Sequence, residues 1–230
     1  MTEQTLLSVP STRAADPWAR LSRVTGLVGL AAFVLIFTPI IAVSTLGEPS
    51  FTATAGEAHA FLVNASVGWV SLAMATLVVA AIGLVWFVVG LTMVLARAEG
   101  SPPWRSVAAL VCGVLLPAHL LLDASWEAAA YRGAGTEPGL ALYAFDVGNL
   151  GFANAWVAMG SFAVASGWVV LSTGVLPRWL GWWAVIAGVG LVLCRFAWTS
   201  EAWFAPYFLF WIWLVIVSVQ LVRGRVGGRP

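Results

Sequence analysis

Six long apolar segments, separated by short polar stretches, dominate the pattern of this chain. A membrane helix needs roughly 20 apolar residues to cross a hydrocarbon core of about 30 Å, and each segment is close to or above that length. The pattern therefore predicts an all-α fold, an integral membrane bundle of six transmembrane helices. The six predicted spans cover residues 24–46, 67–96, 106–130, 140–175, 180–199 and 204–222.

The spans leave no stretch long enough for a soluble domain. We expect an N-terminal arm over 1–23, a six-span membrane domain over 24–222 and a tail over 223–230. The first apolar run is longer than the 7–15 residues of a signal-peptide core, which predicts a retained span. Only 9% of the residues are charged and 61% are hydrophobic. Soluble domains carry about 25% charged residues, so the composition excludes that class.

The arginines predict the direction in which the chain is threaded. Every basic residue is an arginine, and nine of the eleven fall on one side of the predicted bundle: Arg13, Arg20, Arg23, Arg97, Arg105, Arg178, Arg223, Arg225 and Arg229. The other side has Arg132, with Arg195 inside the end of a span, and its loops are acidic. Short loops rich in arginine face the cytoplasm, so both termini are predicted to be cytoplasmic.

Tryptophans and glycines have structural interpretations in such a bundle. Trp104, Trp179, Trp182 and Trp203 fall where spans meet the interface, as in an aromatic belt. Trp86, Trp156, Trp168, Trp211 and Trp213 fall deeper and are expected to pack in the interior. Glycines such as Gly167, Gly181 and Gly188 would let helices approach closely within the bundle.

Three stretches resemble a family of uncharacterised bacterial multi-pass membrane proteins. "TGVLPRWLGWWAVIAGVGLVL" (173–193) joins two spans through a tight Leu-Pro-Arg turn. "DVGNLGFANAWVAMGSF" (146–162) is similar to the start of that family's fourth span, and "RLSRVTGLVGL" (20–30) resembles the start of its first. The resemblance implies a multi-pass fold in the bacterial cytoplasmic membrane, and it brings no activity and no catalytic residues with it.

Polar residues at four-residue intervals interrupt the third span. His119, Asp123 and Glu127 would share one face of a helix, because residues at i and i+4 lie above one another. Arg195 is expected at a similar outer depth of the fifth span. The fourth span contributes three more polar residues, Asp146, Asn149 and Asn154. Ionisable groups in a bilayer face the bundle interior and find partners, and we expect Arg195 to pair with Asp123 or Asp146.

This polar cluster has two interpretations. It is either a closed network that fixes the register of the helices, or an outward-facing pocket that binds a ligand. The number of polar groups exceeds what one ion pair needs, which favours the pocket. The candidate ligand-binding residues are His119, Asp123, Glu127, Asp146, Asn149, Asn154 and Arg195. The depth of Asp146 differs between counts from the two ends of its span, unless the helix kinks at Gly148 or Gly151.

The sequence leads to a protein that binds or passes a small or amphiphilic molecule, with the lipid bilayer as its surroundings and no role in nucleic-acid binding. A zinc site of His59, His119 and a carboxylate is not required by the spacing, so no metal is predicted, and the cofactor stays unknown. "ASWEAAAY" (124–131) bears a short resemblance to an element of membrane-embedded terpene cyclases. A membrane enzyme that uses Asp123, Glu127 and Asp146 as acids, or a structural subunit, is therefore an alternative.

Overall fold

The computed structural model describes residues 16–65, 68–122 and 125–225, and all secondary structure within these ranges is helical. Six helices are long and two are short. The helices are α1 (Pro17–Ser44), α2 (Ala55–Ala65), α3 (Gly68–Glu99), α4 (Trp104–Leu122), α5 (Ser125–Arg132), α6 (Pro138–Thr173), α7 (Arg178–Cys194) and α8 (Phe204–Val222). Single 3₁₀ turns follow α5 and α7 and precede α8.

The long helices coincide with the predicted apolar segments. Five of them, in α1, α3, α6, α7 and α8, are long and apolar enough to cross a membrane, and the apolar part of α4 is shorter. Two boundaries differ from the expectation. The first helix already begins at Pro17, so the last residues of the predicted arm are helical. The predicted third span, 106–130, is covered by two described helices, α4 ending at Leu122 and α5 beginning at Ser125.

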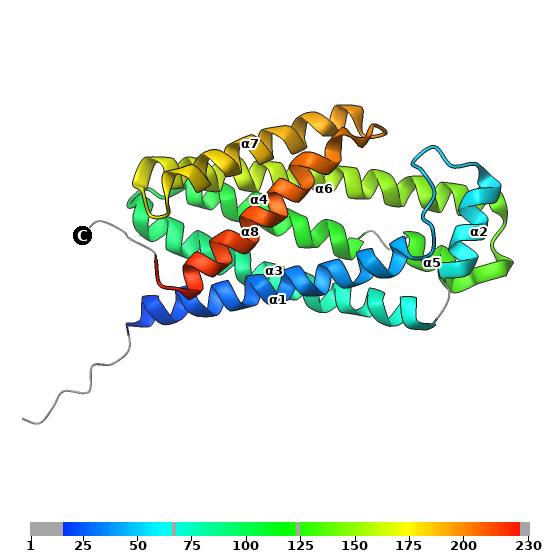
Figure 1. Cartoon of the computed structure of the whole chain (residues 1–230), viewed down its shortest axis with the longest axis horizontal. Coiled ribbons are helices and arrows are strands. Elements are labelled where there is room, and N and C mark those ends of the chain that lie inside the picture. Colours follow the sequence, from blue (N-terminus) through cyan, green and yellow to red (C-terminus); the bar gives the residue numbers. More distant parts are fainter. Residues whose placement is uncertain (1–15, 66–67, 123–124, 226–230) are drawn as a thin grey trace, which may run out of the picture.

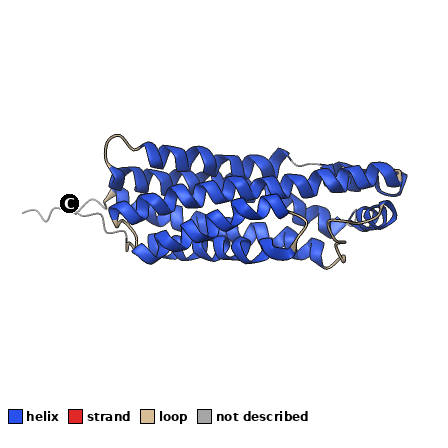
Figure 2. Cartoon of the chain, turned by 90° about the horizontal axis from the view of Figure 1, so that it is seen from above, coloured by secondary structure: helices blue, strands red, loops and turns tan. Residues whose placement is uncertain are grey.

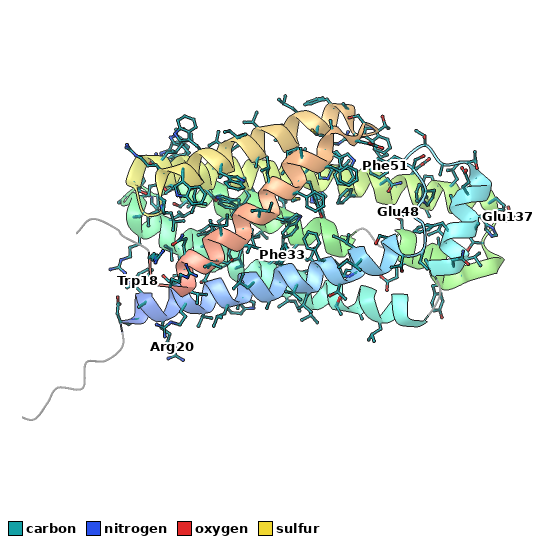
Figure 3. The ribbon with its side chains drawn as sticks, viewed as in Figure 1. Trp18, Arg20, Phe33, Glu48, Phe51 and Glu137 are labelled. Atoms are coloured by element: carbon teal, nitrogen blue, oxygen red, sulfur yellow. The ribbon has the colours of Figure 1, made fainter. Side chains whose placement is uncertain are left out.

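The long helices run along one axis and alternate in direction (Figures 1 and 2). The start of α1 and the end of α8 lie at the same end of the bundle, here called the termini end. The short helices α2 and α5 and the start of α6 lie at the opposite end, here called the far end. Figure 3 places Arg20 at the termini end and the acidic side chains Glu48 and Glu137 at the far end. The charge asymmetry of the sequence therefore corresponds to a difference in charge between the two ends of the bundle.

One large hydrophobic core joins the long helices. Its largest fully buried side chains include Phe87 of α3, Trp156 and Phe162 of α6, and Phe210 and Trp213 of α8. Helix α8 crosses the bundle obliquely and packs against both α1 and α7. The prediction that deep tryptophans pack inside is confirmed for Trp156, Trp211 and Trp213. It is wrong for Trp86 and Trp168, which are 66% and 50% exposed and would face lipid.

Glycines bring α6 and α7 into direct backbone contact, in one of the most extensive helix pairs of the bundle. A side-chain carbon at Gly160 would lie 2.5 Å from the carbonyl oxygen of Gly188, and the reverse holds for Gly188. A carbon at Gly167 would lie 2.7 Å from the carbonyl oxygen of Gly181. No side chain larger than hydrogen fits these positions without displacing a helix. Close packing of these glycines within the bundle is thus confirmed.

A second, smaller hydrophobic cluster forms the far end. Phe61 and Leu62 of α2 pack with Ala129 of α5 and with Ala141 and Phe145 of α6. Helix α6 has 36 residues and is about 54 Å long at 1.5 Å per residue, which exceeds a hydrocarbon core of about 30 Å. The extra length of α6 supports this cluster.

The N-terminus of α2 is held by a reciprocal cap. The backbone N–H and the hydroxyl of Thr54 both donate to Glu57 Oε2 at 2.8 Å, and the Glu57 N–H donates to Thr54 Oγ1 at 3.4 Å. These hydrogen bonds lower the pKa of Glu57. The arrangement is a capping box, which satisfies helix N–H groups that have no partner within the helix. It fixes where the chain enters the far end.

Candidate functional site

The described residues of the predicted stripe lie on two helices, α4 and α5. His119 is half-buried near the end of α4, where its Nδ1 lies 2.7 Å from the carbonyl oxygen of Leu115. A carbonyl oxygen can only accept, so Nδ1 is the donor of this hydrogen bond. Glu127 is exposed in the first turn of α5, beyond the end of α4. Asp123 lies outside the described residues.

Arg195 follows the last turn of α7, and its partner is Asn154 of α6. The Arg195 Nε donates to Asn154 Oδ1 at 2.8 Å. Among the described residues, the ion pair present joins Arg105 to Glu99, and Arg195 and Asp146 are not paired. Asp146 precedes Asn154 by eight residues, about 12 Å along an unbroken helix. Pairing of Arg195 with Asp123 stays a prediction.

Asn149 faces a different side of α6 from Asn154. Five residues separate them, which corresponds to about 140° around the helix at 3.6 residues per turn. Asn149 is only 2% exposed, and its amide Nδ2 has no hydrogen-bond partner among the described residues. It lies between Phe145 of the far-end cluster and Ala153 of the main core. The amide is therefore a buried donor at the junction of two hydrophobic clusters.

A second unpaired donor lies two turns further along the same face. Trp156 is fully buried, and its indole Nε1 has no acceptor in the described part of the chain. Asn149 and Trp156 are separated by seven residues, which returns to the same helix face after about 10 Å. Most buried polar groups have a hydrogen-bond partner, so two such donors on one face need an explanation.

Aromatic rings surround the second donor. The Phe152 ring lies 5.4 Å from those of Trp156 and Trp203, and the Trp156 and Trp203 rings stack at 5.3 Å. The Tyr207 ring lies 5.5 Å from the Phe152 ring. The Phe51 ring, labelled in Figure 3, belongs to the loop after α1 and lies 6.1 Å from the Trp203 ring. We call Phe51, Phe152, Trp156, Trp203 and Tyr207 the aromatic group. Trp203 thus packs partly against the core, and its predicted role as an interface anchor stays a prediction.

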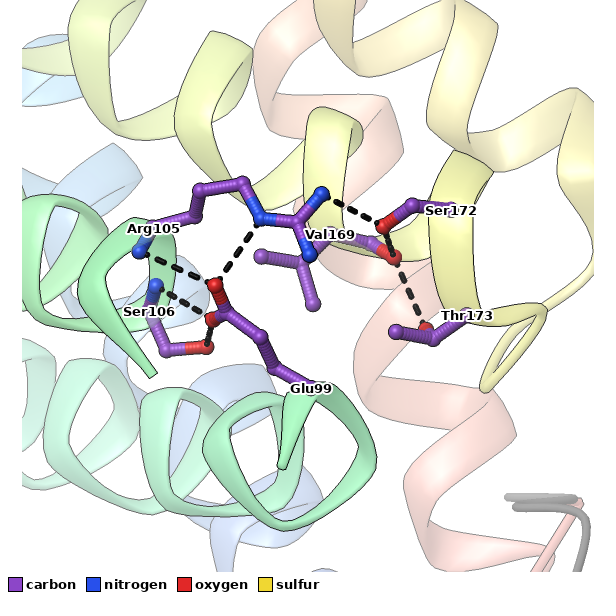
Figure 4. A network of polar contacts seen from close by, with 6 residues as sticks. All are labelled: Glu99, Arg105, Ser106, Val169, Ser172 and Thr173. Atoms are coloured by element: carbon purple, nitrogen blue, oxygen red, sulfur yellow. Dashed lines mark hydrogen bonds and ion pairs between the residues drawn. The ribbon is translucent and has the colours of Figure 1, made fainter. Parts of the chain in front are cut away.

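A third polar arrangement, at the termini end, was missed by the sequence analysis (Figure 4). Glu99, the last residue of α3, accepts hydrogen bonds from the backbone N–H groups of Arg105 and Ser106 at 3.1 and 2.8 Å. It also accepts from Arg105 Nε at 2.8 Å and from the Ser106 hydroxyl at 2.6 Å. Arg105 Nη1 donates to Ser172 Oγ of α6 at 2.8 Å. The carboxylate caps the N-terminus of α4 and ties three helices together. A glutamate six residues before an arginine in a short loop was the available signal.

The chemistry of the remaining candidates is limited. No group of three histidine, cysteine or acidic side chains within the described ranges is arranged to hold a metal ion. Neither Glu127 nor Asp146 has a hydrogen bond or ion pair with another described side chain. Of the seven predicted residues, the structure joins Arg195 to Asn154 and buries Asn149.

The bond between Arg195 and Asn154 makes a measurable prediction. A hydrogen bond to a charged group contributes about 1.5–3 kcal/mol, and partial exposure places this one near the lower limit. We expect Arg195→Ala and Asn154→Ala each to lower the melting temperature in detergent. The double variant should lose less than the sum, with a coupling of about 1 kcal/mol. Strictly additive losses would show that this contact does not stabilise the protein.

Comparisons of the chain with protein-family models, with curated proteins and with solved structures gave no match. The resemblance carried by residues 20–30, 146–162 and 173–193 therefore stays a prediction. The arguments that follow rest on the geometry of this chain.

Proposed function

We propose that this chain is a six-span protein of the bacterial cytoplasmic membrane with both termini in the cytoplasm. Five long apolar helices support its placement in a membrane. Helix α4, with 19 residues and a length of about 28 Å, would be the remaining crossing. An even number of crossings agrees with the common end at which α1 begins and α8 ends. The arginines at this end favour the cytoplasmic side.

Cysteine labelling in intact cells tests this topology. In a Cys112→Ala, Cys194→Ala background, Ser50→Cys at the far end should react with a membrane-impermeant maleimide. Ser101→Cys, between α3 and α4, should react only after the cells are opened. Both serines are exposed, so a difference in labelling reports the side of the membrane and not burial. The reverse pattern would contradict the proposed orientation.

We propose that the far half of the bundle binds a small or amphiphilic molecule. The observation that carries this proposal is the buried Asn149 amide without a partner, in register with the unpaired Trp156 indole. Ligand sites are mostly apolar and aromatic, with a few placed polar groups that orient the ligand. The other rings of the aromatic group supply such a surface beside Trp156. A molecule with an apolar body and acceptor oxygens matches these donors.

Replacement of Asn149 with leucine tests the binding proposal. A buried polar group without a partner costs about 1–3 kcal/mol, so Asn149→Leu should raise the melting temperature of the ligand-free protein. Native mass spectrometry of the purified wild type should show an additional bound mass from the host membrane. Asn149→Leu should lose that mass, and Asn64→Leu, at an exposed position of α2, should retain it. A wild type without a bound mass, or one that Asn149→Leu retains, would overturn the proposal.

No contact among the described acidic residues favours the alternative of a membrane enzyme. Acid catalysis on an apolar substrate would need carboxyl groups that face a common point. Glu127 is exposed on α5, and Asp146 has no described partner. The binding function is therefore the one that the geometry supports best.

A further inference from the structure

An open apolar groove of about 380 Å³ runs along the outside of the bundle, away from the aromatic group. Helix α6 forms its floor with Ser161, Ala165 and Trp168, and α4 and α7 form its walls. Val189 and Leu193 of α7 line it and are 44% and 62% exposed. These apolar side chains would face the hydrocarbon of a bilayer.

The groove has the depth of one bilayer leaflet. Ser161 lies twelve residues before the end of α6 and Leu193 fifteen after the start of α7. These separations correspond to about 18 and 22 Å from the termini end. One leaflet, with its headgroup region, is about 20–22 Å thick. A lipid chain anchored at the termini end would therefore lie along the whole groove.

The termini end of the groove carries cations and tryptophans. The Arg105 guanidinium lies 5.6 Å from the Trp168 ring, and the Trp104 and Trp168 rings meet edge to face at 5.2 Å. Arg105 is engaged by Glu99 and Ser172, which fixes its position but neutralises its charge. The additional positive charge comes from Arg178 at the start of α7. Arg178 is exposed and has no hydrogen bond or ion pair within the described part of the chain.

Arg178 lies on the side of α7 that forms the groove. It precedes Val189 by eleven residues and Val192 by fourteen. Around the helix axis, Val189 and Val192 therefore lie about 20° and about 40° from Arg178, on opposite sides of it. The lining of the groove thus ends in one neutralised guanidinium beside two indole rings, and the free Arg178 begins α7 at the same end, outside the lining. Tryptophans and arginines at this depth lie at the level of lipid headgroups.

We infer that this groove is a binding site for an anionic phospholipid of the leaflet at the termini end. One acyl chain lies in the groove between α4 and α7. The phosphate lies between Arg105 and Arg178, where basic pockets between transmembrane helices hold anionic headgroups. This site is separate from the proposed ligand site at Asn149 and does not depend on it.

Native mass spectrometry with defined lipids tests the inference. The purified full chain is titrated with phosphatidylglycerol and, separately, with phosphatidylcholine of the same acyl chains. The wild type should bind the first phosphatidylglycerol at least fivefold more tightly. Arg178→Gln should weaken phosphatidylglycerol by about fivefold, the factor that corresponds to about 1 kcal/mol for one arginine near an anionic surface. Ala165→Leu, which fills the floor of the groove, should weaken both lipids.

Two matched variants serve as controls. Arg20→Gln removes an exposed arginine of α1 at the same end, and Ala31→Leu enlarges an exposed residue of α1. Both should bind like the wild type, and all four variants should retain the mass that Asn149→Leu loses. Equal affinity for the two lipids, or equal effects of Arg178→Gln and Arg20→Gln, would overturn the inference. Inorganic phosphate should not displace the lipid, and displacement by phosphate would show an anion site without the groove.

Discussion

Gly188→Leu is expected to destabilise the bundle by about 3 kcal/mol, at the upper end of the usual range for overpacked cores. The new side chain would begin 2.5 Å from the Gly160 carbonyl oxygen and 2.9 Å from a Val164 methyl. A backbone carbonyl cannot move aside as a flexible side chain can, so α6 and α7 must separate. The melting temperature in detergent and the fraction of monodisperse protein measure the effect.

Gly139→Leu is the matched control for this prediction. Gly139 lies in the first turn of α6, and a side-chain carbon there meets nothing within 4 Å. The same chemical change at this unpacked position of α6 should leave the melting temperature nearly unchanged. If the two variants melted alike, close packing of α6 on α7 would not be a source of stability.

Arg105→Ala is expected to cost about 3 kcal/mol, because it leaves a buried carboxylate without its counter-charge. The Glu99 side chain is 2% exposed and that of Arg105 18%, so water reaches neither freely. The variant also removes the bond from α4 to Ser172 of α6. Thermal melting in detergent at neutral pH would show the loss, and Arg20→Ala, at an exposed site of the same end, should show almost none.

A second variant separates the charge effect from the loss of contacts. Adding Glu99→Gln to Arg105→Ala removes the uncompensated charge and keeps an amide oxygen that can cap α4. The double variant should therefore recover part of the stability that Arg105→Ala loses. A double variant less stable than Arg105→Ala would mean that the Glu99 charge matters more to the cap of α4 than to the arginine.

The lengths of the apolar segments predicted the long helices, because a helix that crosses a hydrocarbon core needs about 20 apolar residues in a row. They did not predict that the third apolar segment would contribute two described helices, α4 and α5. The alanine-rich pattern of this segment runs on into α5, whereas α5 packs on α2 and α6 at the far end. The same limit explains Trp86 and Trp168, since depth in a span does not say which face of the helix is inside.

Polar partners were harder to predict than polar positions. The cost of ionisable groups in a membrane correctly indicated that Arg195 needs a partner, and its partner Asn154 was among the candidates. Which candidate it contacts depends on the register of α7 against α6, and that register is set by Gly160 and Gly188. Glu99 was missed because its role depends on a turn that brings the end of α3 to the start of α4.

The contact between α1 and α8 joins the first helix of the chain to the last. A side-chain carbon at Gly26 would lie 2.8 Å from a Val222 methyl, and one at Gly29 would lie 2.5 Å from the Phe87 ring of α3. Chains are synthesised from the N-terminus, so α1 enters the membrane long before its α8 partner exists. Until α8 has been synthesised, the part of its small-residue face around Gly26 is open to lipid or to an insertion factor. A ribosome stalled before residue 204 would therefore hold a bundle that cannot close, with Gly26 accessible to a crosslinker that the finished protein excludes.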